Sequence, residues 1–471
     1  MKIVILDDGV NEGWLKEDNI INLAIDENNK VIKREKYNMY KKSHGSICAA
    51  IIKKYAPDSE IISIKVLDDT CYGKCNKLLA ALDWCLANHI KLIHMSIGST
   101  QYTDFEPLRK KTAHLISHNS IIVAACHNAG KYTIPACLSG VIGVKAFDLN
   151  RGRKYSYNMF YLNDAEILAS PYHNLEGECT PFANSYAAPY ITAKVYGYLK
   201  GNNLSIAQVK YKLFMDSLLM ENQQEVNINQ TFAADFIDSA CVIDFAGKFQ
   251  SELCDYRIEN IGINELEAVK LNKNVSVIIF PDKDMRYERL INFLEINKKY
   301  LIGVVVCGQV NEEFRKYLIS QQDCLVWSSS SPNTLQQAYI EKLENTEIPI
   351  ISIICKDRNM QLAFGKKIAK KFKDSNYGTM LLSDEVSSPV YGYTYITTGT
   401  IINNFVYQCI NRMEPDIAIA VFNNEISINS DLQIYCTDPN KQIYDIYDGD
   451  IAVSLQADYH SIVDIVANYM S

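Results

Sequence analysis

The feature that most constrains the fold is a regular alternation of short apolar strands with segments of helical spacing. In the first third of the chain, runs rich in Val, Ile and Leu alternate with stretches whose apolar residues recur every three or four positions. The expected strands are residues 2–6, 61–67, 90–95 and 121–125, with helices at 76–88 and 106–118. This rhythm is typical of a mostly parallel sheet covered on both faces by helices.

Composition excludes several classes of protein. Hydrophobic residues make up 48% of the 471-residue chain, enough for folded cores and against disorder. The net charge is −8 without a basic block, so we expect no nucleic-acid partner. No apolar run approaches a membrane span and no signal-peptide core follows Lys2, so we expect no membrane partner. The 14 scattered cysteines then favour reduced thiols in a cytoplasmic protein.

Two expected elements carry residues with catalytic potential. Asp7 ends the first strand and precedes Asp8 and Gly9. A carboxylate at the carboxyl edge of a parallel sheet is a common active-site position, although Asp and Gly also form ordinary turns. His44 stands at or just before the first turn of an expected buried helix. An imidazole there can act as a base, whereas a single histidine is more often structural.

Two further candidates follow along the chain. Ser185 lies in a turn of small residues, and Pro189 after it can open a helix at its first position. The hydroxyl would then lie at a helix N-terminus, beside N–H groups that can hold an oxyanion. A serine before a helix is more often a cap than a nucleophile, so the residue alone leaves both roles open. Asn128 follows the expected strand at 121–125.

The order of these candidates resembles a known family. They follow one another as Asp, His, Asn and Ser, which is the order found in the subtilisin-like serine proteases, or subtilases. The segments that also match are Lys65-Val66-Leu67-Asp68, Ala81-Leu82-Asp83-Trp84, Met95-Ser96-Ile97-Gly98 and Val141-Ile142-Gly143-Val144. The resemblance covers about residues 1–220 and implies a subtilisin-like, doubly wound parallel sheet.

The resemblance implies the roles of individual residues. Ser185 would be the nucleophile, His44 its general base, and Asp7 the carboxylate that orients His44. Asn128 would donate its side-chain amide to the oxyanion. An extended substrate strand and the first specificity pocket would be formed by Tyr72, Gly73, Ser96, Ile97, Gly98, Ala125, Cys126 and His127.

The chain departs from the family pattern around these residues. Asp8 replaces the usual Ser or Thr, and His127 stands where glycine is usual in the wall of the first pocket. Ala183 and Asn184 replace Gly-Thr before the nucleophile, and Tyr186 replaces Met after it. No catalytic atom is lost by these changes, so we expect an active enzyme.

The resemblance also implies two absences. The first strand begins at residue 2, so we expect no N-terminal pro-domain, and residues 53–60 leave no room for the calcium-binding loop of many secreted relatives. Cys71 and Cys75 lie close together but lack two further ligands at matching spacing. We therefore expect neither a metal ion nor another cofactor.

Strand–helix alternation resumes in the second half. We expect a protease domain at residues 1–220, a linker at 221–238 and an accessory α/β domain at 239–471. The expected strands are residues 275–280, 302–307, 324–327, 348–355, 379–382, 417–422 and 451–455, and the helices include 312–321, 362–372 and 461–469.

The accessory domain resembles a degenerate P-loop or Rossmann-like fold. Residues 348–355 and the following helix stand where a P-loop would, but its glycines and lysine are missing. A loop without these residues cradles phosphates poorly. We therefore expect a partner, a segment of the substrate or a second copy of the chain as ligand, rather than a nucleotide.

The combination resembles subtilases of bacterial peptide-maturation systems, which remove the leader from ribosomally made, modified peptides. We therefore expect a cytoplasmic endopeptidase that binds one precursor peptide as an extended strand and cuts off its leader. Two alternatives stay open: an inactive, peptide-binding subtilase-like module, supported by Asp8, His127 and Asn184, and a broader intracellular turnover protease.

Overall fold

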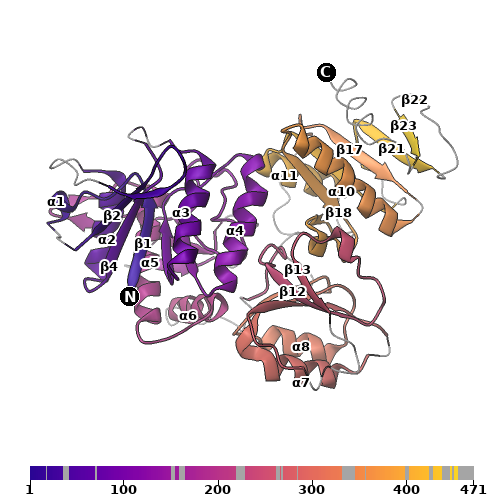
Figure 1. Ribbon diagram of the computed structural model, residues 1–471, viewed down its shortest axis with the longest axis horizontal. Helices are drawn as coiled ribbons and strands as arrows, with labels where there is room; N and C mark the ends of the chain where they lie inside the picture. Colours follow the sequence, from indigo (N-terminus) through magenta and orange to yellow (C-terminus); the bar gives the residue numbers. More distant parts are fainter. Residues whose placement is uncertain are drawn as a thin grey trace.

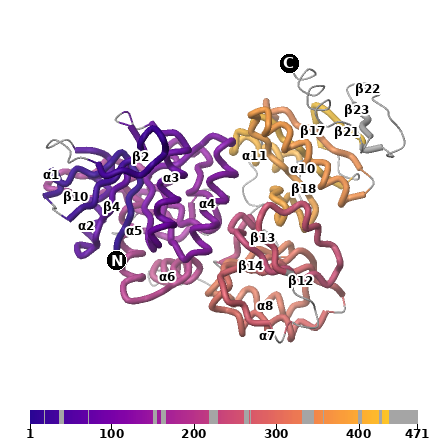
Figure 2. Tube along the Cα trace, viewed as in Figure 1, coloured from indigo at the N-terminus to yellow at the C-terminus, as the bar shows by residue number. Residues whose placement is uncertain are grey.

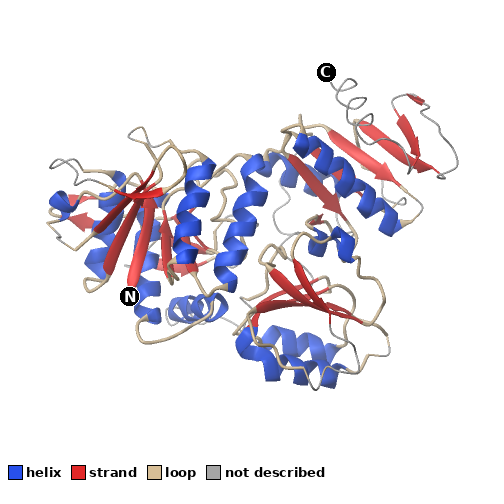
Figure 3. Cartoon of the chain, in the orientation of Figure 1, coloured by secondary structure: helices blue, strands red, loops and turns tan. Residues whose placement is uncertain are grey.

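The computed structural model shows three α/β units along the chain (Figure 1). The residues described are 1–16, 19–34, 42–68, 70, 72–149, 154–158, 165–218, 229–260, 266, 269–283, 285–330, 345–355, 357–397, 402–423, 428–437, 446–447 and 450–454. Each unit has strands at its centre and helices outside them (Figure 3). The predicted α/β class is confirmed.

The first unit is built around a nine-stranded sheet of order β3-β2-β4-β1-β5-β6-β7-β9-β8. All neighbouring pairs are parallel except β2 with β3 and β8 with β9. The strands are β1 (Lys2–Asp7), β2 (Ile21–Ile25), β3 (Val31–Lys33), β4 (Glu60–Lys65), β5 (Leu92–Met95), β6 (Ile121–Ala125), β7 (Ile142–Ala146), β8 (Tyr155–Tyr157) and β9 (Ile167–Ala169).

Helices cover both faces of this sheet, as the apolar strands require. Alternate residues of β1 enter different cores: Ile3 and Ile5 join one cluster, and Val4 and Leu6 the other. On the first unit, the first cluster includes side chains of α2 (His44–Tyr55), α5 (Asn184–Leu199) and α6 (Ile206–Leu218), together with Ile116. The second takes them from α3 (Cys75–Ala87) and α4 (Phe105–Ser117). Burial on both faces explains why β1 is apolar at successive positions instead of alternating.

The second unit is a five-stranded, all-parallel sheet of order β13-β12-β14-β15-β16. This is one of the common orders of doubly wound sheets. Its strands are β12 (Ser239–Asp244), β13 (Arg257–Asn260), β14 (Val275–Phe280), β15 (Leu301–Val306) and β16 (Leu325–Ser328). Helices α7 (Tyr287–Asn297) and α8 (Glu312–Ser320) lie side by side along it (Figure 1).

The third unit holds a seven-stranded sheet of order β19-β18-β20-β17-β21-β23-β22. Its strands are β17 (Ile350–Ile354), β18 (Thr379–Ser383), β19 (Thr394–Tyr395), β20 (Ile417–Val421), β21 (Leu432–Thr437), β22 (Ile446–Tyr447) and β23 (Asp450–Ser454). Its helices include α10 (Arg358–Asp374) and α11 (Ile402–Met413).

The second half therefore contains two sheets among its described residues, where we expected a single accessory domain. All seven strands expected there are present within one or two residues. One large sheet and two successive smaller sheets give the same alternation of strands and helices along the chain. The sequence pattern therefore could not predict the number of sheets. The expected helix at 461–469 lies outside the described residues, and the limits at 220 and 239 stay predictions.

The described part of the expected linker, residues 229–238, is packed between units. Main-chain groups of Asn229 and Thr231 bond the main chain of Val326 on β16 at 2.8 and 2.7 Å. Phe236 is 1% exposed, and its ring fills the space that a side chain at Gly303 would need. This segment thus joins the second unit to the first by contacts rather than only by the chain.

The start of α10 replaces the phosphate site of a P-loop with charged side chains. The carboxylate of Asp357 accepts a hydrogen bond from the Met360 N–H at 3.0 Å and so caps the helix. Arg358 forms ion pairs with Asp384 and Glu385. A negative charge already occupies the helix N-terminus, which disfavours a second anion there. Among the described residues, no helix is both long and apolar enough to cross a membrane.

Candidate active site

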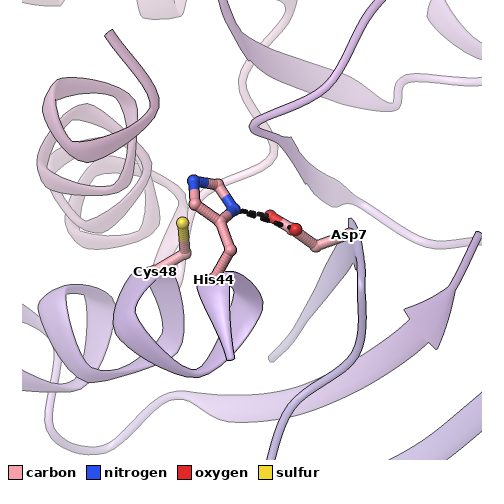
Figure 4. Close-up of side chains that lie close together, drawn as sticks. All are labelled: Asp7, His44 and Cys48. Carbon is pink, nitrogen blue, oxygen red and sulfur yellow. Dashed lines mark hydrogen bonds and ion pairs between the residues drawn. The ribbon is translucent and has the colours of Figure 1, made fainter. Parts of the chain in front are cut away.

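Asp7 and His44 form a hydrogen-bonded pair at the carboxyl edge of the first sheet (Figure 4). Asp7 is the last residue of β1 and is 1% exposed, and His44 is the first residue of α2. The ring Nδ1 of His44 lies 2.9 Å from both carboxylate oxygens of Asp7. A proton on Nδ1 donates to this carboxylate, which leaves Nε2 as the base.

Gly45 allows this close approach of helix and strand. A Cβ at Gly45 would lie 2.8 Å from the carbonyl oxygen of Gly9 and 3.1 Å from the Cβ of Asp7. The first distance is shorter than real Cβ contacts, so any side chain here would push α2 away from β1. The glycine therefore sets the separation at which His44 reaches Asp7.

Asp8, the unusual second carboxylate, caps α2 from outside the helix. Its Oδ2 accepts from the His44 N–H at 3.1 Å and its Oδ1 from the Gly45 N–H at 2.8 Å. Burial and the neighbouring Asp7 charge raise the pKa of Asp8 despite these bonds. An anionic group at a helix N-terminus stabilises the helix, so Asp8 holds the backbone that carries the base.

The two carboxylates also act on the charge of His44. Burial of the ring disfavours the protonated form, but the charge and hydrogen bond of Asp7, with the charge of Asp8, outweigh burial. The pKa of His44 is therefore raised above its ordinary value of 6.5. This environment stabilises the imidazolium that forms when the base accepts a proton.

Ser185 lies next to this pair, in the first turn of α5. The cap of α5 is Ala183, without a side-chain cap bond, so Ser185 is not the capping residue that its sequence setting also suggested. The ring of Tyr186 lies 5.4 Å from the His44 ring, which places the start of α5 against the base. Among the described residues, Oγ of Ser185 has no hydrogen-bond partner, so its hydroxyl is free to turn.

We expected Pro189 to open the helix, but α5 begins at Asn184 and Pro189 lies inside its second turn. In an α-helix, the N–H of residue 189 would bond the carbonyl of Ser185, and proline has no N–H. The freed carbonyl of Ser185 instead accepts the hydroxyl of Ser96 at 2.9 Å and the thiol of Cys48 at 3.5 Å. Because the proline frees this carbonyl, Ser185 is hydrogen-bonded both to the loop after β5 and to α2.

A buried histidine, His94, is hydrogen-bonded to the Ser96 hydroxyl. His94 on β5 is fully buried, with Nε2 2.9 Å from the Ser96 hydroxyl and Nδ1 2.8 Å from the Thr192 hydroxyl on α5. Burial lowers the pKa of His94 to about 4, so the ring is neutral at pH 7. Thr192, His94 and Ser96 form a polar chain that ends on the carbonyl of Ser185. The sequence analysis missed His94, because a lone histidine in an apolar strand carries no signal of its partners.

Cys48 lies one turn after His44 on the same helix face (Figure 4). Its thiol is buried, and burial together with the Asp7 charge raises its pKa well above the ordinary value. It is therefore a protonated donor rather than a nucleophile. Ligand atoms of Asp7, His44 and Cys48 lie within 4.8 Å of one another, a spacing that a metal ion could bridge. The absence of a bound metal stays a prediction.

Asn128, which we expect to donate to the oxyanion, is held by the residue before Ser185. Its side-chain oxygen accepts the N–H of Asn184 at 2.8 Å, which leaves the amide N–H groups to donate elsewhere. Asn128 itself is exposed at the carboxyl edge of β6. The N–H of Ser185, in the first turn of α5, has no acceptor within the helix, and its role as a second oxyanion donor stays a prediction.

Asn184 has a structural function that the sequence analysis did not foresee. Its side chain is buried and makes three hydrogen bonds: to the carbonyls of Cys126 and His127 at 3.1 and 3.0 Å, and from the Ala146 N–H at 2.7 Å. These bonds fasten the loop after β6 to the helix of the nucleophile. The departure from the family pattern at this position therefore supports the site.

The residues expected to bind substrate lie at the same edge of the sheet, in loops after their strands. Ser96, Ile97 and Gly98 follow β5, and Ser99 pairs with Ile134 through two main-chain hydrogen bonds of 2.8 and 2.9 Å. A Cβ at Gly98 would lie 2.5 Å from the Thr133 side chain, so glycine is required for this close pairing. Tyr72 is 77% exposed, and Gly73 beside it is exposed as well.

The loop after β6 forms the expected wall of the first pocket. Ala125 and Cys126 are buried, whereas His127 is exposed. The N–H of His127 bonds the Thr133 hydroxyl at 3.0 Å, and its Nδ1 accepts the Ala129 N–H at 3.2 Å. His127 is thus fixed by its own loop. The binding roles of these residues stay predictions.

Comparisons with known proteins agree with this geometry. Residues 1–234 match the family model described as the subtilase family. The thermostable alkaline protease of Halalkalibacterium halodurans is 28% identical over 178 residues, 37% of this chain and 46% of its own. Subtilisin DY of Bacillus licheniformis is 26% identical over 137 residues, 26% of this chain and 49% of its own. The chain thus spans about half the length of these two curated relatives.

Two solved structures are each similar to 45% of the chain. A cold-adapted subtilisin-like serine proteinase has 18% identity and a TM-score of 0.35, covering 45% of this chain and 81% of its own. A lanthipeptide protease has 16% identity and a TM-score of 0.36, covering 45% and 78%. The family match coincides with the unit that holds Asp7, His44, Asn128 and Ser185, and residues 1–234 of this chain form a domain of the subtilase family.

Proposed function

We propose that this protein is a serine endopeptidase that cleaves a specific peptide. The observation that carries the proposal is the pair of 2.9 Å contacts from His44 Nδ1 to the buried Asp7, beside a serine in the first turn of a helix. This constellation orients a base, supplies a nucleophile and offers oxyanion donors at one edge of a sheet.

The mechanism follows from the position of each group. Oγ of Ser185 attacks the peptide carbonyl while Nε2 of His44 accepts its proton, and Asp7 stabilises the imidazolium. The oxyanion receives hydrogen bonds from the Asn128 side chain and the Ser185 N–H. His44 then protonates the leaving amine. A water molecule, activated by His44 in the same way, hydrolyses the acyl-enzyme and restores Ser185.

The substrate binds as an extended strand along residues 96–98 on one side and Tyr72-Gly73 on the other. His127 projects from the wall of the first pocket and is held by two hydrogen bonds, which favours a small or polar side chain at the residue before the cleaved bond. Selectivity of this kind suits an enzyme that cuts one precursor in the cytoplasm rather than unfolded proteins in general.

We further propose that the substrate is a ribosomally made precursor peptide and that the enzyme removes its leader. Two contacts connect the accessory half to the loop after β6 that carries Asn128. Lys131 forms an ion pair with Glu414 at 2.9 Å, and Tyr132 lines a cavity together with residues of the third unit. Accessory units that touch the pocket wall are well situated to hold the part of a precursor outside the cleft.

A fluorophosphonate probe tests the catalytic proposal. We expect labelling of the wild-type protein, and its loss in Ser185→Ala and in His44→Ala. Ser320→Ala, which removes an exposed serine of α8, is the matched control and should label like the wild type. A folded wild-type protein that binds peptides but takes no label would instead identify a peptide-binding module.

Substrate selectivity is tested separately. The enzyme is offered precursor peptides with leaders alongside unfolded casein, and the products are identified by mass spectrometry. We expect one cut in one precursor and little cleavage of casein. Equal rates on both would refute the leader-removal proposal and favour a turnover protease.

A further inference from the structure

A cavity of about 120 Å³ lies where the three units meet, and Asp7, His44, Asn128 and Ser185 are not among the residues that line it. Its walls come from Tyr102, α4 and Tyr132 of the first unit, and from residues 232–235 and Ile237 of the segment between units. Asp255 and Tyr256 of the second unit and residues within 389–395 and 405–413 of the third unit complete them. Figure 2 shows α4 on the side of the first unit that faces the other two. No role in the proposed mechanism requires this cavity.

Aromatic side chains form much of the wall. The rings contributed by the three units include Tyr102, Phe105, Tyr132, Tyr256, Tyr395 and Phe405. Tyr102 and Phe105 stack at 5.6 Å with nearly parallel planes, and Phe105 meets Tyr132 at 6.4 Å. A buried apolar cavity of about 150 Å³ admits a benzene molecule, so the space here suits a single aromatic ring. Such a ring would gain offset or edge contacts with its neighbours.

The same cavity has a donor that the protein leaves unused. Arg109 is 8% exposed, and its Nε and Nη2 bond Glu106 at 3.0 and 2.9 Å, with a further bond to Asp255 at 3.4 Å. Among the described residues, Nη1 of Arg109 has no hydrogen-bond partner. The two N–H groups of Nη1 are thus available to a ligand in the cavity.

An acceptor lies near this donor. Asp235 lines the cavity, and its carboxylate accepts the Ser139 N–H at 3.2 and 3.1 Å. Burial raises the pKa of the Asp235 carboxyl group to about 6. Its oxygens keep lone pairs for one more donor.

The charges select a neutral ligand. A carboxylate would meet Glu106, Asp235 and Asp255, and an ammonium group would meet the guanidinium groups of Arg109 and Arg412. A hydroxyl on an aromatic ring accepts from an N–H and donates to a carboxylate without carrying a charge. We propose that this junction cavity binds a phenolic ring, with its hydroxyl between Arg109 and Asp235.

The ligand would touch the loop of the proposed oxyanion donor. Tyr132 forms part of the cavity wall and lies in the loop that runs from Asn128 to Ile134. The phenol could belong to a tyrosine side chain of a bound peptide or to a free small molecule. Neither source depends on peptide cleavage, so the site can be tested in the Ser185→Ala protein as well as in the wild type.

Calorimetric titration of the full chain with p-cresol, the side chain of tyrosine, tests the proposal. Toluene has the same ring and methyl group without the hydroxyl. We expect p-cresol to bind at least about 10-fold more tightly than toluene, because only p-cresol pairs the buried Arg109 and Asp235. Equal affinities, or no binding of p-cresol at about 10 mM, would overturn the proposal.

Variants that fill the cavity with an added side chain show where p-cresol binds. Ala233→Phe and Cys409→Phe each add a ring at the cavity wall and should abolish p-cresol binding, while Ala87→Phe at an exposed end of α3 should not. Thermal unfolding identifies which filled variant is folded, and one suffices. Unchanged affinity in a folded filled variant refutes the site.

The two sources of the phenol are separated by competition. The capped peptide acetyl-Gly-Gly-Tyr-Gly-Gly-amide is titrated against bound p-cresol, with the Phe analogue as control. Displacement by the Tyr peptide alone supports a tyrosine of a peptide ligand. Binding of p-cresol without displacement by either peptide supports a free phenol as the ligand.

Discussion

Asn184→Ala is the perturbation whose effect follows most directly from the structure. It removes a buried side chain that accepts from the Ala146 N–H and donates to the carbonyls of Cys126 and His127. Each buried main-chain group left without a partner costs about 1–3 kcal/mol, and the carbonyls can recover part of this by local movement. We therefore expect a loss of about 2–4 kcal/mol in the free energy of unfolding.

The same change should reduce catalysis through Asn128. Without the side chain of Asn184, the loop after β6 loses its bonds to the start of α5. The main-chain N–H of Asn184 can still donate to Asn128, but the loop that carries Asn128 is held less firmly. Complete loss of one oxyanion donor lowers kcat by about 10²–10³, which sets the upper limit. We expect kcat to fall by about 10-fold or more with KM little changed, since the substrate strand does not contact Asn184.

Urea unfolding measures the first effect and steady-state hydrolysis of a peptide substrate the second. Asn128→Ala is the reference, and the double variant tests whether both residues act through one donor. If they do, Asn128→Ala with Asn184→Ala has the same kcat as Asn128→Ala alone. Multiplicative effects on kcat, or a destabilised Asn184→Ala protein with wild-type kcat, would refute the reasoning.

Two further changes test the helix that carries the base. Gly45→Ala places a Cβ 2.8 Å from the Gly9 carbonyl and should abolish fluorophosphonate labelling and lower the melting temperature, whereas Gly197→Ala, with open space at its Cβ, should leave labelling intact. The raised pKa of His44 means that its protonated form stabilises the folded state below pH 6.5, and that this contribution is lost as pH rises through the folded pKa. Activity needs the neutral His44 ring and therefore rises as the pH passes through the pKa of His44. Because the Asp8 charge raises this pKa, Asp8→Asn should move the acid limb of the kcat/KM profile to lower pH. An unchanged or higher midpoint would contradict the influence of the Asp8 charge.

The catalytic candidates could be predicted because each lies at the end of a recognisable element. Asp7 ends an apolar strand, Asn128 follows another, and His44 and Ser185 lie in the first turns of helices. Parallel strands bring their carboxyl ends to one edge of the sheet, so the order of the elements already placed these residues near one another. The structure supplies the distance of 2.9 Å between His44 and Asp7, which no spacing along the chain determines.

The supporting residues could not be predicted in the same way. His94 and Thr192 are 98 positions apart, and Asn184 meets Ala146 across 38 positions. Each looks ordinary in its own segment, since its function depends on which buried group faces it in the folded chain. Pro189 shows the same limitation: its effect is to free a carbonyl, and only the tertiary contacts reveal that Ser96 uses it.

The sequence by itself determined many of the strands and helices of this protein, the two-sided burial of its first sheet and the identity of the catalytic candidates, because apolar period and local turn chemistry act over a few residues. Only the tertiary structure decided that the second half forms two sheets, that residues 229–238 are packed between units, and that Arg109 and Asp235 face one cavity. Those features depend on long-range packing, in which the partner of a side chain is set by the path of the whole chain and not by its neighbours in sequence.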